Sequence, residues 1–213
     1  MARRKVTRKK WKKKVDHLSS IVISLLALYG FFTVMKMMIG DIPNSLASSS
    51  SNHVLVESSP SHEAFIEQLA PTAQQLQDEF GVLPSIILGQ AILESDWGTS
   101  QLAASYYNLY GIKGYDDTSV MLETKEFVDG KWKTIQAPFK VYANWEESMR
   151  DHSLLFVNGV DWNPQLYHAV LQATNYRDAA AALQSAGYAT DPNYQEKIVS
   201  VIENYQLAQY DSR

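Results

Sequence analysis

Apolar residues recur at helical spacing through most of the chain after residue 60. The pattern predicts a first helix from Ser59-Pro60-Ser61 to Gly81, which Pro71 divides or bends. A second helix is predicted from Pro84 to Gly98 because proline favours a helix start and glycine a helix end. Further helices are predicted over residues 99–105, 145–157, 164–172, 175–185 and 192–206.

The periodicity changes between residues 120 and 141. Residues 120–128 and 131–141 are rich in β-branched and aromatic side chains, and Asp129-Gly130 between them is a strong hairpin turn signal. The sequence therefore predicts an α+β domain, mostly helical, with a small β-hairpin inserted after its second or third helix.

The N-terminal region differs from the rest in charge and hydropathy. Nine of the 19 lysines and arginines lie in the first 14 residues, and an apolar run from Leu18 to Ile39 follows them. Positive residues before an apolar segment favour the cytoplasmic side, which would leave the body of the protein outside. We expect a basic cytoplasmic tail at 1–17, a transmembrane anchor or uncleaved signal at 18–40, a Ser-rich flexible linker at 41–60 and a folded domain at 61–213.

This organisation predicts a single-pass protein of the cell membrane with an extracellular domain. Ser45-Leu46-Ala47 offers an alternative, because it has the small-x-small pattern of a signal cleavage site. Cleavage after Ala47 would release the domain. A basic arm for nucleic acid is a second alternative for the N-terminal cluster.

Composition narrows the possible partners. From Asp41 onward the chain carries 22 acidic and 9 basic residues, a net charge of −13, which disfavours binding to nucleic acid. Cysteine is absent, so an exported domain would depend on its own core for stability. The five histidines show no metal-ligand spacing, and no Gly-rich phosphate loop occurs. We expect neither a metal nor a cofactor.

Glu94 ends a nearly all-apolar segment that starts at Ile86. At 3.6 residues per turn it shares a stripe with Leu83, Ile87 and Ala91, so its carboxyl is expected among buried neighbours. Desolvation disfavours a carboxylate and keeps the acid protonated to higher pH. A protonated acid is what cleavage of a glycosidic bond needs. A carboxyl capped by a backbone amide or paired with an arginine is the structural alternative.

A second carboxylate stands in the predicted hairpin. Glu126 shares one face of a period-two strand with Leu122, Thr124 and Val128, so its neighbours on that face are partly apolar. Such a group could activate water or stabilise the charge at the anomeric carbon. The alternative is an exposed strand residue paired with Lys125 or Lys133.

Aromatic residues are a further signal, since the chain has 12 tyrosines and five tryptophans. Aromatic faces stack on the apolar faces of sugar rings. The candidates for substrate binding are Trp97, Tyr110, Tyr188 and Tyr194, and packing within the core is the alternative for each. Asn108 and Lys113, in the loop after the Glu94 helix, could contact an acetamido or carboxylate substituent, although Asn108 is equally suited to ordering that loop.

Ordered blocks of sequence from Leu83-Pro84-Ser85 to Gly187–Tyr194 resemble family 73 of the glycoside hydrolases, the bacterial cell-wall β-N-acetylglucosaminidases. The resemblance covers about residues 61–208, and one departure is Asp96, where glycine is commoner. The matching blocks are Gln90–Ser100, Asn108–Gly114, Thr124–Phe127, Asp129–Trp132, Phe139–Tyr142, Glu147–His152 and Gly187–Tyr194.

The resemblance implies a lysozyme-like fold and hydrolysis of the β-1,4 bond after N-acetylglucosamine in the glycan strands of peptidoglycan. It assigns Glu94 as the catalytic acid, Glu126 as the second glutamate, and Tyr188 and Tyr194 as tyrosines near the substrate. Inversion with water activated by Glu126 and retention through the substrate's 2-acetamido group both stay open. An N-acetylmuramidase and a non-catalytic peptidoglycan-binding scaffold are the alternative functions.

Overall fold

The computed structural model describes residues 61–128, 131–189 and 191–212, and the side chains of residues 125–132 fall outside this description. The predicted tail, membrane segment and linker at residues 1–60 lie outside the described residues. Within the described ranges, no helix combines the length and the apolarity needed to cross a bilayer.

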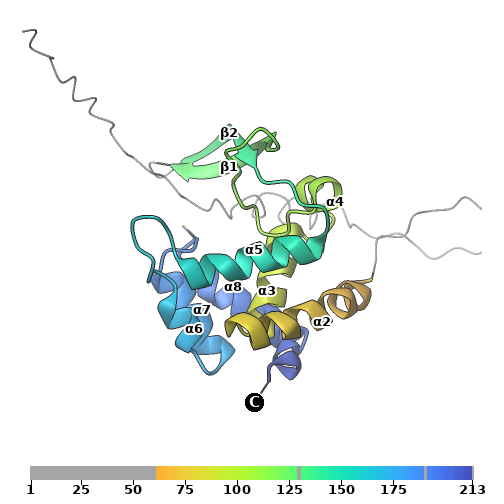
Figure 1. Ribbon diagram of the computed structural model, residues 1–213, viewed down its shortest axis with the longest axis vertical. Coiled ribbons are helices and arrows are strands. Elements are labelled where there is room, and N and C mark those ends of the chain that lie inside the picture. Colours follow the sequence, from red (N-terminus) through yellow and green to blue (C-terminus); the bar gives the residue numbers. More distant parts are fainter. Residues whose placement is uncertain (1–60, 129–130, 190, 213) are drawn as a thin grey trace, which may run out of the picture.

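The described elements form a mostly helical body with one hairpin at its edge (Figure 1). This arrangement confirms the predicted α+β class. In chain order the elements are α2 (His62–Phe80), α3 (Pro84–Ser95), α4 (Gln101–Tyr106), β1 (Val120–Val128), β2 (Lys131–Phe139), α5 (Trp145–Asn158), α6 (His168–Gln172), α7 (Tyr176–Ser185), α8 (Tyr194–Asn204) and the 3₁₀ helix η1 (Leu207–Tyr210).

Helix α2 runs without interruption through Pro71, so the predicted division of this segment is wrong. Buried residues stand on both sides of the proline, among them Leu69 and Ala73, and their packing holds the helix together where one backbone N–H is missing. The Ser61 side chain caps the first turn, and Gly81 ends the helix in the left-handed conformation, with φ of 77°.

Helix α3 ends earlier than predicted. Asp96, with φ of 51°, is its C-cap, whereas the sequence predicts Gly98 in that role. The buried Ser95 hydroxyl donates to the carbonyl of Ala91 at 2.6 Å and accepts from the Gly98 amide at 2.7 Å. These bonds lead the chain away from the helix axis directly after Ser95. Gly98 is still required there, because a Cβ atom would come within 2.8 Å of the Phe65 ring.

Three other predicted elements are longer than the observed ones. Helix α6 begins only at His168, because residues before it form turns around Asn163, whose carbonyl accepts from the Val160 and Leu166 amides. Helix α8 covers Tyr194–Asn204 within the predicted 192–206. Strand β2 ends at Phe139 rather than at residue 141.

Strands β1 and β2 form the predicted antiparallel hairpin. Their register runs from Val120 opposite Phe139 to Val128 opposite Lys131. The turn residues Asp129 and Gly130 lie outside the described residues. A further β-bridge joins Lys113 to Phe139 and connects the loop after α4 to the base of the hairpin.

Helix α3 is the centre of the helical body and packs against α2, α7, α8 and η1. All of its residues from Pro84 to Ile92 are buried, which explains its nearly continuous apolar sequence. Gly89 lets α8 approach closely, since a Cβ atom at this position would lie 3.1 Å from the Ile202 side chain. This close contact holds the middle of α3 against the side chains of Ile198 and Ile202 on α8.

Candidate active site

Glu94 lies in the last turn of α3, on the stripe that its sequence predicts. Leu83, Ile87 and Ala91 of that stripe are buried in the core. The Glu94 side chain itself is partly exposed. It thus combines apolar surroundings with partial exposure of the residue.

The Glu94 carboxyl is held by a tyrosine rather than by an arginine. The hydroxyl of Tyr194, in the first turn of α8, donates to Glu94 Oε1 at 2.8 Å. Gln90, one turn before Glu94 on α3, donates from Nε2 to the Tyr194 oxygen, also at 2.8 Å. Gln90 and Tyr194 are both buried, so the bond between them does not compete with bulk water.

The surroundings of Glu94 favour its neutral form. Burial raises the pKa of Glu94 well above its ordinary value of 4.5, and the negative charge of Asp191 adds to the shift. The Tyr194 hydrogen bond and the positive charge of Lys197 act in the opposite direction but do not overcome burial. Glu94 therefore keeps its proton to a higher pH than a surface glutamate, as a general acid must.

Asp191 and Lys197 form an ion pair with each other at the start of α8. Asp191 also accepts from the Asn193 amide at 2.9 Å, and its carbonyl accepts from the Tyr194 amide at 3.2 Å. This pair orders the turn that carries Tyr194 toward Glu94. Because the two opposite charges lie together, their effects on Glu94 partly cancel.

Two further predicted tyrosines lie in the same buried region. Tyr188, in the segment after α7, stacks on Tyr194 with 5.6 Å between ring centroids, and its hydroxyl lies 3.1 Å from Nε2 of His152. Tyr110 stacks on the His152 ring at 3.8 Å and donates to the Ile87 carbonyl at 3.3 Å. Tyr110, Tyr188 and Tyr194 are each at most 2% exposed. They pack and hydrogen-bond beneath Glu94 instead of presenting open ring faces to a sugar.

Asn108 orders the loop after α4. Its amide nitrogen donates to the carbonyls of Ile112 and Lys140, each at 2.9 Å, and its oxygen accepts from the Ile112 amide at 3.0 Å. Asn108 is 1% exposed. Its placement fits the loop-ordering role that the sequence left open and leaves no exposed amide for substrate.

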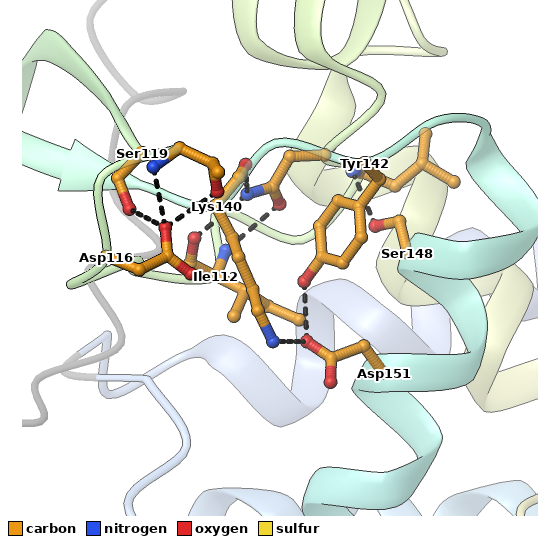
Figure 2. A network of polar contacts seen from close by, with 10 residues as sticks. Ile112, Asp116, Ser119, Lys140, Tyr142, Ser148 and Asp151 are labelled. Carbon is orange, nitrogen blue, oxygen red and sulfur yellow. Dashed lines mark hydrogen bonds and ion pairs between the residues drawn. The ribbon is translucent and has the colours of Figure 1, made fainter.

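The same loop is anchored to α5 by a polar network (Figure 2). The Lys140 ammonium lies 2.8 Å from Asp151 Oδ2, and the Tyr142 hydroxyl donates to the same oxygen at 2.6 Å. The loop after α4 is bonded to this lysine as well, because the Ile112 carbonyl accepts from the Lys140 amide at 2.9 Å. It also contacts α5 directly, where the Ser148 hydroxyl accepts from the Leu109 amide at 3.1 Å. The loop is therefore fixed to the helical body at several points.

Trp97 and Lys113 each contact other aromatic rings. Trp97 is partly exposed, but the ring of His62 stacks on one of its faces at 3.6 Å between centroids, and Tyr205 approaches it edge-on at 4.6 Å. The Lys113 ammonium lies 4.0 Å from the centre of the Phe139 ring at the base of the hairpin.

Glu126 is in strand β1, in register with Lys133. Thr124, two positions earlier, is buried, whereas its neighbour Glu123 is exposed, which agrees with the predicted alternation of this strand. The Glu126 side chain lies outside the described part, so its proposed role stays a prediction.

Sequence reasoning did not identify Gln90 or His152 as parts of the site. Gln90 had a recognisable signal, because it is the one uncharged amide inside the apolar run from Ile86 to Leu93 and stands four residues before Glu94. His152 carried no comparable signal, since its partners Tyr110 and Tyr188 are distant in the sequence. Among the residues that the structure describes, no group of three or more His, Asp or Glu could hold a metal ion.

A family model described as glucosaminidase, mannosyl-glycoprotein endo-beta-N-acetylglucosaminidase, matches residues 70–207. The chain belongs to this glucosaminidase family. It is therefore a glycoside hydrolase, and the resemblance inferred from the sequence blocks is confirmed.

Curated relatives of the glucosaminidase family differ in their named activities. The exo-glucosaminidase LytG of Bacillus subtilis (strain 168) is 43% identical over 207 residues, which are 97% of this chain and 70% of LytG. A probable N-acetylmuramidase of Lactococcus lactis subsp. cremoris is 42% identical over 155 residues, 71% of this chain. The match spans only 35% of that relative's length.

A solved member shares the fold. The catalytic domain of the autolysin Auto from Listeria monocytogenes is 37% identical and superimposes with a TM-score of 0.65, over 78% of this chain and 92% of the Auto domain. The mostly helical, lysozyme-like body with a small two-stranded sheet is thus the fold of a glucosaminidase catalytic domain.

Proposed function

We propose that this glucosaminidase hydrolyses the β-1,4 bond after N-acetylglucosamine in the glycan strands of peptidoglycan, with Glu94 as general acid. The observation that carries the proposal is Glu94, a partly exposed residue whose carboxyl is held by Tyr194 and whose neutral form is favoured by burial. The acid proton passes to the glycosidic oxygen as the bond between that oxygen and the anomeric carbon breaks. Water then completes the hydrolysis.

The first experiment compares wall digestion by the full chain and by Glu94→Gln. The variant should keep its fold and its affinity for the wall, while turnover falls at least about a hundredfold, the scale of losing an acid catalyst. Glu67→Gln is the matched control, because Glu67 is an exposed glutamate on α2. Near-normal turnover by Glu94→Gln would contradict the assignment. A wild-type chain that binds wall and releases no soluble fragments would support a non-catalytic scaffold instead.

For the second step, the proposal has two forms. Glu126 activates the water, or the substrate's own 2-acetamido oxygen attacks the anomeric carbon. Glu126→Gln, with the exposed Glu123→Gln as control on the same strand, separates them. A large loss confined to Glu126→Gln supports the first form, together with inverted configuration in the first-formed product. Retained configuration with much of the rate preserved supports the second.

An N-acetylmuramidase is the second candidate, since the Lactococcus relative carries that name at 42% identity. Mass spectrometry of the digested wall identifies the reducing-end sugar of each fragment. N-acetylglucosamine at that end supports a glucosaminidase, and N-acetylmuramic acid a muramidase. The same spectra distinguish internal cleavage, which gives fragments of many lengths, from the exo cleavage named for the Bacillus relative.

We further propose that the apolar segment at 18–40 anchors the chain in the cell membrane, with the catalytic domain outside. The nine basic residues among the first 14 support this orientation. A tethered hydrolase would act on wall within reach of its linker at a high local concentration. Cell fractionation and the mass of the mature chain test the proposal: a soluble product starting at Ser48 would replace the anchor with a cleaved signal.

A further inference from the structure

The amide of Gln90 contacts Tyr194 beneath the candidate acid. Gln90 is fully buried on α3, and its Nε2 donates to the Tyr194 hydroxyl at 2.8 Å. This bond defines the orientation of the amide group, because its nitrogen can only donate. Its oxygen, Oε1, is buried and has no hydrogen-bond partner among the described residues.

The direction of this bond determines where the Tyr194 proton lies. A hydroxyl has a single proton, and an amide nitrogen can only donate. Because the Tyr194 oxygen accepts from Gln90, the Tyr194 proton is left for Glu94 Oε1, 2.8 Å away. An amide turned the other way would offer Oε1 to Tyr194 and draw that proton off Glu94.

The consequence for catalysis concerns the two oxygens of the Glu94 carboxyl. Oε1 accepts from Tyr194 and so acts as the carbonyl oxygen of the protonated acid. We propose that Gln90 is a positioning residue that directs the Tyr194 hydroxyl to Oε1 and thereby keeps the transferable proton on Oε2. This inference rests on the proposed role of Glu94 as the acid. Gln90 itself is fully buried and acts only through Tyr194.

The ionisable groups that influence Glu94 come from several elements. They lie on α8, in the turn before it, in the segment after α7 and in the loop after α4, and they are Tyr194, Lys197, Asp191, Tyr188 and Tyr110. The Asp191–Lys197 pair is held in the turn before α8 through the Asn193 amide, so a change at Gln90 leaves both charges in place. A change in the pH profile of a Gln90 variant therefore reports the hydrogen bond through Tyr194.

The test uses the full 213-residue chain, with peptidoglycan glycan strands as substrate. The variants are Gln90→Met, Tyr194→Phe, the double variant and Glu94→Gln, and Leu88→Met is the control at another fully buried position of α3. Gln90→Met should lower kcat about tenfold, less than the hundredfold or more seen when a donor touches the reacting group, with KM within about twofold. The alkaline limb of the pH–kcat profile of Gln90→Met should move to higher pH, because a weaker Tyr194 hydrogen bond stabilises the Glu94 carboxylate less.

The double-mutant cycle gives the decisive comparison. If Gln90 acts through Tyr194, Gln90→Met should have no further effect on kcat in the Tyr194→Phe background. If Gln90→Met lowers kcat equally in the wild-type and Tyr194→Phe backgrounds, the inference is overturned. It is also overturned if Gln90→Met leaves kcat and its pH profile unchanged while Glu94→Gln is inactive. An active Glu94→Gln would instead overturn the proposed function. If Gln90→Met does not fold, Gln90→Leu takes its place, and a Tyr194→Phe variant without the alkaline shift overturns the inference by itself.

Discussion

The Tyr194 hydroxyl at the start of α8 donates a 2.8 Å hydrogen bond to Oε1 of Glu94, 100 positions earlier in the chain. The bond gives the carboxyl a defined orientation in surroundings that are too dry to stabilise its charge. Glu94 is consequently a group that costs stability once ionised and that is suited to donate a proton.

The first prediction concerns the stability of Glu94→Gln. Burial raises the pKa of Glu94 in the folded state above its ordinary value of 4.5, so the folded chain holds a proton that the unfolded chain has released over that interval. Stability therefore falls as pH rises through the interval, and the loss is complete above the folded-state pKa. A glutamine has no such cost. Thermal unfolding should give Glu94→Gln a higher Tm than wild type at pH 8.

The difference in Tm should disappear below about pH 4, where both states of wild type are protonated. Glu67→Gln is the control, since its exposed side chain on α2 should leave Tm unchanged at both pH values. A Glu94→Gln variant no more stable than wild type at pH 8 would show that ionised Glu94 is well accommodated.

Two features could be predicted from the sequence because they depend on local periodicity: the burial of the helical stripe that ends at Glu94, and the formation of the β-hairpin. Leu83, Ile87 and Ala91 pack as a helical repeat requires, and β1 and β2 pair across the expected turn. The end of α3 could not be predicted in the same way. It depends on the Ser95 hydroxyl, which bonds Ala91 and Gly98 and ends the helix before the expected glycine.

The polar partners of the site were beyond sequence reasoning for a different reason. Tyr110, His152 and Tyr188 come from three separate segments and meet only in the folded chain. Hydrophobic periodicity gives no information about such contacts. Asn108 is similar, since it reaches Lys140 across 32 positions. An amide in an aromatic loop is compatible with both substrate binding and loop ordering, and only the tertiary contacts distinguish them.

The second prediction tests the role of Asn108. Asn108→Ala removes two donors and one acceptor from buried backbone partners and should lower the free energy of unfolding by about 2–4 kcal/mol. Chemical denaturation measures the loss. Thr118→Ala is the control, because it removes an exposed hydroxyl bonded to Asp116 between the same loop and the hairpin, and it should cost much less. Unchanged stability of Asn108→Ala with weakened wall binding would instead favour direct substrate contact.

The third prediction concerns the backbone after α3. Asp96 has φ of 51°, in the left-handed region that is strained for residues with a Cβ atom, although less for Asn and Asp than for the others. Asp96→Gly should raise the free energy of unfolding by about 0.5–1 kcal/mol, and Asp96→Ala should lower it by about 1 kcal/mol. Denaturation curves of the pair check the sign. If alanine is tolerated as well as glycine, the turn is not under the strain that this conformation implies.

The last prediction concerns acid stability and His152. Burial lowers the pKa of His152 to about 3 from its ordinary 6.5, so in this interval the unfolded chain binds a proton that the folded chain excludes. Stability contributed by the neutral ring is therefore lost as pH falls from 6.5 toward 3, by about 1.4 kcal/mol per pH unit. His152→Gln keeps a hydrogen-bonding partner for Tyr188 but cannot titrate. The variant should be less stable than wild type at pH 7, because the stacking on Tyr110 is lost. Its free energy of unfolding should nevertheless fall less than that of wild type between about pH 6.5 and 4.5. His168→Gln, at an exposed position in α6, should keep the wild-type slope, and an equally steep slope for His152→Gln would mean that another group causes the acid sensitivity.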